Sequence, residues 1–225
     1  MHFKTMAGLG LALAISATSA HALTPVTSIT SFEGSTISVG DYGYSADETG
    51  KWFATGHPVA TLPGVTFSGM AGLQVNSPAW GFPNAPDGTT TAFLQSYGGE
   101  TNGAVTVNLS GLGLKAGETY DLVFYTAGRP ATGAPTFSVS YDGHTTPFAA
   151  PSTSGFTREV FNFTADGGSS VTFAAMTGKA NDASFALDNL GLTVPEPATW
   201  MMMLIGFGGL GAVLRANRRR AIVPA

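Results

Sequence analysis

Apolar residues recur at every second position along much of this chain, and that alternation limits the fold more than any other feature of the sequence. In residues 104–109 the apolar side chains are Val105, Val107 and Leu109, and residues 135–141 repeat the pattern. A two-residue period places alternate side chains on opposite faces of a β-strand, whereas an amphipathic helix needs a period of about 3.6 residues. No long stretch shows the helical period, so the chain between its two ends is predicted to be all-β.

The predicted strands are short and are separated by turns rich in glycine and proline. The pair Asp142-Gly143, for example, follows the strand at 135–141 as a hairpin turn. About nine or ten such strands without intervening helices pack as two antiparallel sheets face to face, and we expect a jelly-roll sandwich. The clearest strands are expected at residues 104–109 and 119–126. Further strands are expected at residues 27–32, 65–67, 91–95, 135–141, 156–164, 171–175 and 184–193.

Composition narrows the classes of partner and chemistry. The chain has no cysteine, which excludes disulfides, thiol nucleophiles and cysteine-ligated zinc. Residues 23–193 contain 13 acidic and five basic side chains, although the net charge of the whole chain is only −4. A domain with this excess of acidic groups repels phosphates. Nucleic acid and anionic lipid are therefore not expected as partners.

The first residues have the features of a secretory signal peptide. Lys4 provides a basic start, an apolar or small-residue core follows, and Ala20 and Ala22 complete an A-x-A cleavage site. We expect signal peptidase to remove residues 1–22. The exported domain then spans residues 23–193.

A three-part tail occupies residues 194–225. A proline-rich motif comes first, an uncharged apolar run at 198–214 follows, and a cluster of arginines comes last. At about 1.5 Å per residue, the 17-residue run gives a transmembrane helix of about 25 Å, just long enough for a thin bilayer. Arginines hold the adjoining end of such a helix in the cytoplasm, which leaves the body on the far side of the membrane. The residues concerned are Pro195, Glu196, Pro197, Trp200, Arg215, Arg218, Arg219 and Arg220.

This tail resembles the PEP-CTERM sorting signal over residues 194–220. The Pro195-Glu196-Pro197 motif, Trp200, the glycine-rich apolar run and the arginine cluster occur in the family's order. The resemblance implies a bacterium with two membranes and processing by exosortase, a membrane-embedded cysteine protease or transpeptidase. It also implies a transient stay in the inner membrane before the protein reaches the outer surface or the extracellular matrix. The alternative is an ordinary C-terminal anchor that is retained.

The body resembles the galactose-binding-like jelly rolls, a group that includes many carbohydrate-binding modules. The likeness lies in the order of short segments: Ser31-Phe32-Glu33, the region of Trp52 and Trp80, Pro86-Asp87-Gly88, residues 114–122, and residues 185–190. In that family the first and last strands are neighbours, and acidic groups on them help to bind a structural calcium ion. The resemblance therefore implies a calcium site at Glu33 and Asp188.

Aromatic residues in loop-like segments suggest glycan binding. Aromatic faces stack on the apolar sides of pyranose rings, while polar neighbours bind the hydroxyl groups. The candidates are Tyr42, Tyr44, Trp52, Trp80 and Tyr97, with Phe82 beside them. The expected partner is extracellular polysaccharide, as in a biofilm. Packing within the core or the loops is the other explanation for each ring.

The body offers little catalytic machinery. After removal of the signal peptide its histidines are His57 and His144, and it has no H-E-x-x-H or G-x-S-x-G motif. We therefore expect a non-catalytic surface or matrix protein. Three alternatives stay open: a structural or adhesive protein without a small ligand, a glycoside hydrolase whose two carboxylates converge from distant positions, and an ice-binding protein.

Overall fold

The computed structural model describes residues 27–98, 100–130, 135–151, 155–176, 182–193, 204–209, 211–212 and 215. The predicted signal peptide lies outside the described residues together with most of the sorting motif: Ala20, Ala22, Pro195, Glu196, Pro197, Trp200, Arg218, Arg219 and Arg220. Residues 204–209, 211–212 and Arg215 are helical and exposed. Within the described part of the chain, no helix is both long and apolar enough to cross a membrane.

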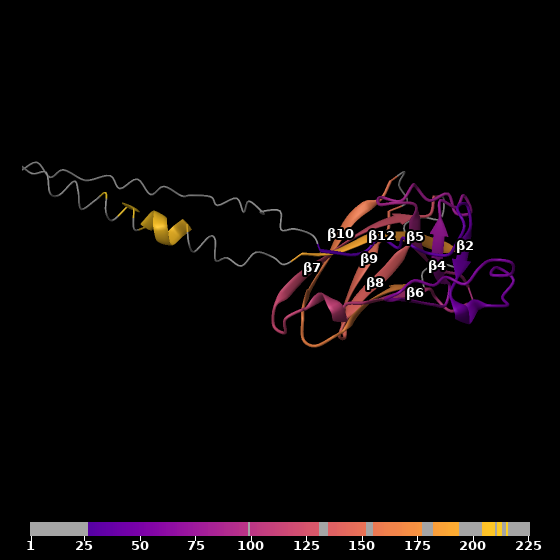
Figure 1. Cartoon of the computed structure of the whole chain (residues 1–225), viewed down its shortest axis with the longest axis horizontal. Helices are drawn as coiled ribbons and strands as arrows, with labels where there is room; N and C mark the ends of the chain where they lie inside the picture. The colour runs from indigo at the N-terminus through magenta and orange to yellow at the C-terminus, as the bar shows by residue number, and fades with distance from the viewer. Residues whose placement is uncertain are drawn as a thin grey trace, which may run out of the picture.

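Two antiparallel sheets form the body (Figure 1), as the sequence predicts. The larger sheet has seven strands, in the order β10 (Thr157–Thr164), β7 (Thr119–Gly128), β12 (Ala183–Thr193), β5 (Thr90–Ser96), β4 (Ala71–Val75) and β2 (Tyr42–Tyr44), with β1 (Thr27–Thr30) also paired to β12. The smaller sheet has five strands, in the order β3 (Val65–Ser68), β6 (Ala104–Asn108), β11 (Ser170–Ala175), β8 (Thr136–Tyr141) and β9 (His144–Ala149). Short 3-10 helices lie at η1 (Ala46–Glu48) and η2 (Ser110–Leu112).

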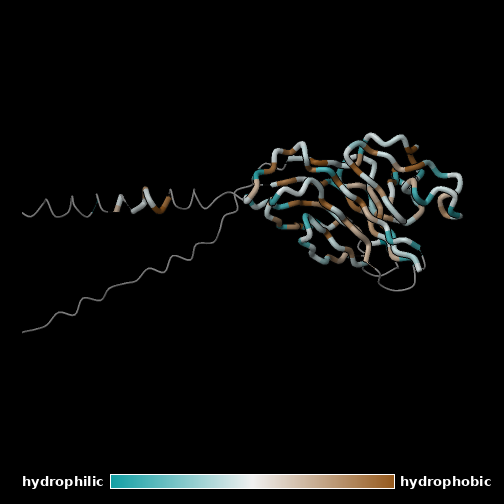
Figure 2. Tube along the Cα trace, turned by 90° about the horizontal axis from the view of Figure 1, so that it is seen from below, coloured by the Kyte–Doolittle hydropathy of each residue, from teal (hydrophilic) through white to brown (hydrophobic). Residues whose placement is uncertain are grey.

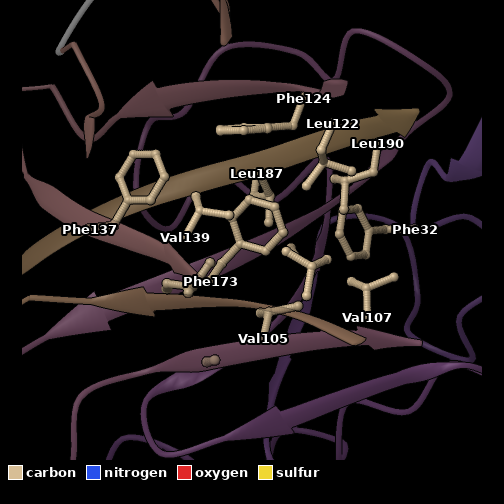
Figure 3. Packing of buried hydrophobic residues seen from close by; sticks show 14 of the residues in the cluster. Phe32, Val105, Val107, Leu122, Phe124, Phe137, Val139, Phe173, Leu187 and Leu190 are labelled. Atoms are coloured by element: carbon tan, nitrogen blue, oxygen red, sulfur yellow. The ribbon is translucent and has the colours of Figure 1, made fainter. Parts of the chain in front are cut away.

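The main core fills the space between the two sheets (Figure 3). Phe137 of β8 stacks on Phe185 of β12 with ring centroids 4.5 Å apart. Phe124 of β7 meets Phe173 of β11 edge-on at 5.1 Å. All four rings are fully buried, and the trace of the body in Figure 2 changes repeatedly between hydrophobic and hydrophilic residues. The apolar face of each sheet is thus buried against the other, which is how a chain without cysteine can stabilise a domain of this size.

Three described strands are missing from the sequence prediction, and each lacks the two-residue pattern. β4 is buried at every position, so no polar residue marks its alternate positions. β2 has only three residues. β9 is a largely exposed edge strand that contains Pro147, a residue tolerated there because an edge strand leaves part of its backbone unpaired.

The larger sheet also buries part of its outer face, the face turned away from the smaller sheet. On β5, Ala92 and Leu94 belong to the main core, whereas Phe93 belongs to a separate cluster. We call this second group the outer aromatic cluster; it comprises Tyr44, Met70, Trp80 and Phe93, with Tyr42, Phe53, Ala54 and Phe82 packed against it. Burial on both faces explains why every residue of β5 is buried.

Candidate functional site

Neighbouring strands of the larger sheet place their side chains in rows across its outer face. Tyr42 of β2 pairs with Gln74 of β4, which pairs with Thr91 of β5. Two residues further along the same strands, the next row on this face holds Tyr44 and Phe93. Directly paired residues share a face of the sheet, and so do residues two apart on one strand. Aromatic and polar side chains therefore lie side by side on this face.

Trp80 is the centre of the outer aromatic cluster. Its ring centroid lies 4.4 Å from that of Phe93, 4.6 Å from that of Tyr42 and 6.1 Å from that of Phe82. Only 8% of its surface is exposed. Aromatic pairs at these separations stabilise by about 0.5–1.5 kcal/mol beyond the area they bury. The cluster therefore fixes the position of Phe82, which lies at its edge.

A cavity of about 170 Å³ lies beside Phe82 on this outer face. Most of its lining is polar, from a buried floor of Gln74, Ser77 and Thr91 to an exposed rim that includes Asn76, Asn84 and Thr89. Phe82 contributes an aromatic wall. Among the described residues, no acidic, basic or histidine side chain lines the cavity. The cavity is thus a neutral, polar hollow with one aromatic surface, which suits a small polyhydroxylated ligand.

Gln74 is the least satisfied polar side chain on the floor of this cavity. Its Nε2 donates a hydrogen bond to Thr91 Oγ1 at 2.9 Å. Its Oε1 is buried and has no hydrogen-bond partner among the described residues. An unpaired buried carbonyl oxygen costs about 1–3 kcal/mol. A hydroxyl group of a ligand that donated to this oxygen would remove the cost.

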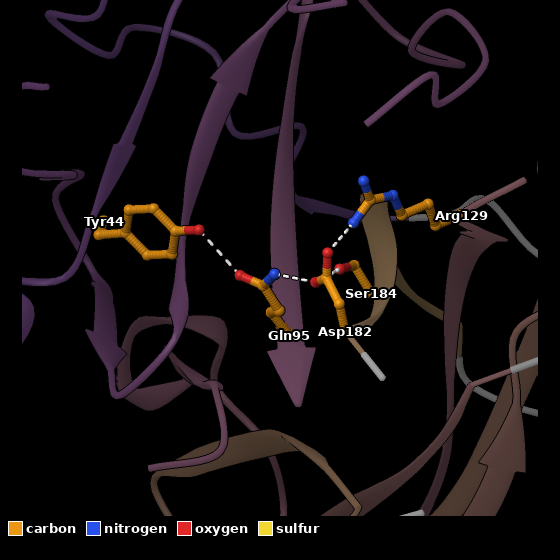
Figure 4. Close-up of polar contacts among 5 residues, drawn as sticks. All are labelled: Tyr44, Gln95, Arg129, Asp182 and Ser184. Carbon is orange, nitrogen blue, oxygen red and sulfur yellow. Dashed lines mark hydrogen bonds and ion pairs between the residues drawn. The ribbon is translucent and has the colours of Figure 1, made fainter. Parts of the chain in front are cut away.

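A second polar group lies further along the same face and joins Tyr44 to Arg129 (Figure 4). The Tyr44 hydroxyl donates to Gln95 Oε1 at 2.8 Å, and Gln95 Nε2 donates to the Asp182 carboxylate. Arg129 pairs with the same carboxylate, and the Ser184 hydroxyl lies 3.4 Å from it. Burial raises the pKa of Tyr44 well above its usual value, which keeps this hydroxyl a donor. These groups satisfy one another, so we assign them to holding the outer aromatic cluster on the sheet.

His57 and Asp41 support the exposed side of the cluster. His57 Nδ1 lies 2.8 Å from Asp41 Oδ1, and the His57 ring stacks on Tyr42 with centroids 3.8 Å apart. The backbone N–H of Tyr42 and the contact with His57 lower the pKa of Asp41, although partial burial opposes them. The carboxylate is therefore charged at neutral pH and holds His57 against Tyr42, which in turn packs on Trp80.

The structure brings both Glu33 and Asp188 into contact with the segment 87–90. Glu33 Oε1 accepts the backbone N–H groups of Thr89 and Thr90 at 2.7 and 2.6 Å. Asp188 has no exposed surface, and its two oxygens accept the N–H groups of Asn189 at 2.7 Å and Asp87 at 3.3 Å. The first strand pairs with the last, as the resemblance implies. The two acids thus meet around one segment of chain.

The surroundings of Asp188 disfavour the charged form of its carboxyl group. Burial raises the pKa of Asp188 to about 7, against the lowering effect of two backbone N–H groups, and the carboxylates of Asp87 and Glu33 raise it further. None of the groups that shift this pKa is basic. Calcium takes six to eight oxygen ligands, roughly, and here two carboxylates would supply part of that shell. The described residues hold no group of three or more His, Cys, Asp or Glu side chains suited to a metal, so backbone carbonyls and water would have to complete the shell.

The predicted ligand-binding aromatics divide into buried and exposed groups. Tyr44 and Trp80 are buried, and Tyr42 is half-buried; the two tyrosines lie in β2 and not in a loop. Trp52 and Tyr97 are 75% and 41% exposed. None of these five lines the cavity described above. Their role in binding stays a prediction.

The residues that line the cavity were mostly missed by sequence reasoning. The sequence pattern indicates Phe82 only as a neighbour of the main candidates, and it indicates neither Gln74 nor Thr91. The sequence does mark Gln74 in one way: it lies between two apolar residues, Leu73 and Val75, in a stretch where apolar and polar residues do not alternate. A polar residue in such a stretch has to find a partner once it is buried.

Comparison with known proteins confirms the sorting motif. The PEP-CTERM protein-sorting motif matches residues 193–220. This motif indicates an exported protein that passes through a membrane. No curated protein matches the chain.

Solved structures similar to the chain include carbohydrate-binding jelly rolls. The CBM22-1 xylan-binding domain of Paenibacillus barcinonensis Xyn10C is 17% identical, with 62% of this chain and 90% of that one covered and a TM-score of 0.41. The C-terminal family 22 carbohydrate-binding module of Clostridium thermocellum Xyn10B is 13% identical, with 60% and 88% covered and a TM-score of 0.41. The active domain of tailspike protein 4 of bacteriophage CBA120 is 12% identical, with 60% and 20% covered and a TM-score of 0.42. These likenesses concern the fold alone.

Proposed function

We propose that this chain is an exported, non-catalytic glycan-binding protein that exosortase processes through the C-terminal tail. The match of residues 193–220 to the sorting motif supports the route. Signal peptidase would act first, the tail would then hold the protein briefly in the inner membrane, and exosortase would release or transfer it. The expected destination is the outer surface or the extracellular polysaccharide of a bacterium with two membranes.

The observation that carries glycan binding is the neutral polar cavity beside Phe82, lined at its floor by Gln74, whose buried Oε1 has no partner among the described residues. A sugar ring has hydroxyl groups around its edge and an apolar face, so an aromatic wall and a buried amide match its two kinds of surface. A glycosidase needs a pair of carboxylic acids beside the scissile bond. The lining of this cavity has none, which favours binding without hydrolysis.

Replacing Phe82 with alanine is expected to weaken glycan binding about tenfold, because the ring supplies the aromatic wall; tenfold corresponds to about 1.4 kcal/mol. Affinity electrophoresis of the full chain in detergent, through gels that contain soluble polysaccharides, measures the effect. Val160→Ala is a suitable control, since Val160 is 38% exposed on β10 and does not line the cavity. Trp52→Ala tests in parallel whether the exposed indole extends the site.

The thermal unfolding of each variant separates lost binding from lost folding. A folded Phe82→Ala protein that migrates as the wild type does would move the site away from the cavity. A wild-type chain retarded by no polysaccharide would contradict glycan binding and leave the structural or adhesive alternative.

We also propose a structural calcium ion between Glu33 and Asp188. The support is geometric: two carboxylates flank the segment 87–90, and one of them has no exposed surface. An ion there would join the segment that follows β1, through Glu33, to β12, through Asp188.

A further inference from the structure

We infer that the cavity takes one neutral sugar residue at the end of a glycan chain, and that Gln74 selects it by accepting a hydroxyl hydrogen bond. This inference rests on the proposed function, since it names the ligand class of the same cavity. Three properties of the cavity support it: its size, its charge and the state of the Gln74 amide.

The size of the cavity limits the ligand to one ring. A protein cavity of about 150 Å³ holds a single benzene molecule, and this one measures about 170 Å³. One pyranose ring therefore fits, with its substituents toward the rim at Asn84 and Thr89, whereas a second ring has to lie outside. The floor is closed by Gln74 and Thr91, which belong to adjacent paired strands. We therefore expect a polysaccharide to enter by an end and not to run through.

The charge of the cavity limits the ligand to a neutral sugar. No lysine, arginine or histidine of the described part of the chain lines it, so the carboxylate of a uronic acid would be buried there without a positive partner. Removing an unpaired carboxylate from water is strongly unfavourable. The polar lining of amides and hydroxyls provides partners for sugar hydroxyl groups instead.

Gln74 gives the site its specificity. The Nε2 of Gln74 already donates to Thr91, and the Oε1 of Gln74 lacks a partner among the described residues. A site that holds a hydroxyl with a buried acceptor rejects an analogue without that hydroxyl, because the acceptor then stays unpaired. Gln95 offers a comparison on the same face: it is also buried, but its Oε1 accepts from Tyr44 and its Nε2 donates to Asp182.

Isothermal titration of the full chain tests this with D-glucose, D-galactose, D-mannose and D-xylose, the corresponding uronic acids and neutral oligosaccharides of increasing length. We expect at least one neutral monosaccharide to bind within about threefold of its best oligosaccharide, and its uronic acid to bind at least about tenfold more weakly. Gln74→Met is expected to weaken binding about tenfold or more with little change in melting temperature. Val160→Ala, on β10 and outside the cavity lining, is expected to keep the affinity for sugar.

The outcomes distinguish this inference from the proposed function. Affinity that rises steadily with chain length, equal binding of uronic acids, or full affinity in a folded Gln74→Met protein would each overturn the inference and leave glycan binding intact. Absence of binding by any saccharide would overturn both. A Val160→Ala protein that loses affinity as strongly as Gln74→Met would show that the effect is structural, and would also overturn the assigned role of Gln74.

Discussion

Replacing Gly72 with alanine is expected to lower the free energy of unfolding by about 3 kcal/mol, at the upper end for an overpacked site. Gly72 lies in β4 between Tyr44 of β2 and Phe93 of β5. A Cβ atom at this position would lie 1.8 Å from the carbonyl oxygen of Gly43 and 3.0 Å from Phe93 Cε1. A backbone oxygen cannot yield as the end of a side chain can, so the pairing of β2 with β4 would have to break.

Loss of the pairing between β2 and β4 would also disturb the outer aromatic cluster, because the hydroxyl of Tyr44 in β2 donates a hydrogen bond to Gln95. Urea unfolding measures the stability, and near-ultraviolet circular dichroism reports the packing of Tyr44 and Trp80. Gly111→Ala is the matched control: no atom lies within 4 Å of a Cβ built there, and its backbone is not left-handed. We expect that control to change stability by less than about 0.5 kcal/mol. Equal stability of the two variants would mean that β2 does not pair as described.

Calcium is expected to raise the melting temperature by about 5–10 °C when its concentration is 100 times the dissociation constant. At that ratio, a ligand that binds only the folded chain adds about 2.7 kcal/mol to the free energy of unfolding. In a domain of this size, each additional kcal/mol raises the melting temperature by about 2–4 °C. Thermal unfolding after dialysis against a chelator, with calcium added back stepwise, measures the effect.

Asp188→Asn is the control for this measurement, since it keeps the shape of the buried side chain but removes its charge. The variant should unfold at the same temperature with and without calcium. Magnesium should have a smaller effect on the wild type, because it demands a tighter octahedral shell and gives up its water reluctantly. An unchanged melting temperature of the wild type in millimolar calcium would argue against the site, and would leave Asp188 as a buried acid held by two backbone N–H groups.

The strands could be predicted from the sequence where one face is exposed to water and the other is buried. Residues 104–109 and 135–141 show the alternation, and both form strands in the smaller sheet. The pattern fails for β4, whose residues are buried on both faces, since the outer aromatic cluster covers the face that would otherwise be polar. Alternation reports exposure to water, so a strand between two apolar layers gives no such signal.

The candidate site was harder to predict than the fold. The aromatic residues were found, but sequence alone could not separate Trp80, which is buried in the cluster, from Trp52, which is exposed. The cavity depends on Gln74 and Thr91 meeting across paired strands. Residues 76–89 join these two strands, so no short hairpin turn reveals their register in the sequence. The proximity of Glu33 and Asp188 was anticipated through the resemblance of the body to a family in which the first and last strands are neighbours.

The claim on which the others depend is that this domain is delivered outside the cell by its C-terminal tail. Mass spectrometry of the protein from membrane and extracellular fractions, in cells with and without exosortase activity, tests it most directly. We predict a mature form that begins at Leu23 and ends near residues 195–197, present only when exosortase is active. An intact tail retained in the inner membrane of both strains would contradict this, and would make the protein an anchored sandwich with no route to the extracellular matrix.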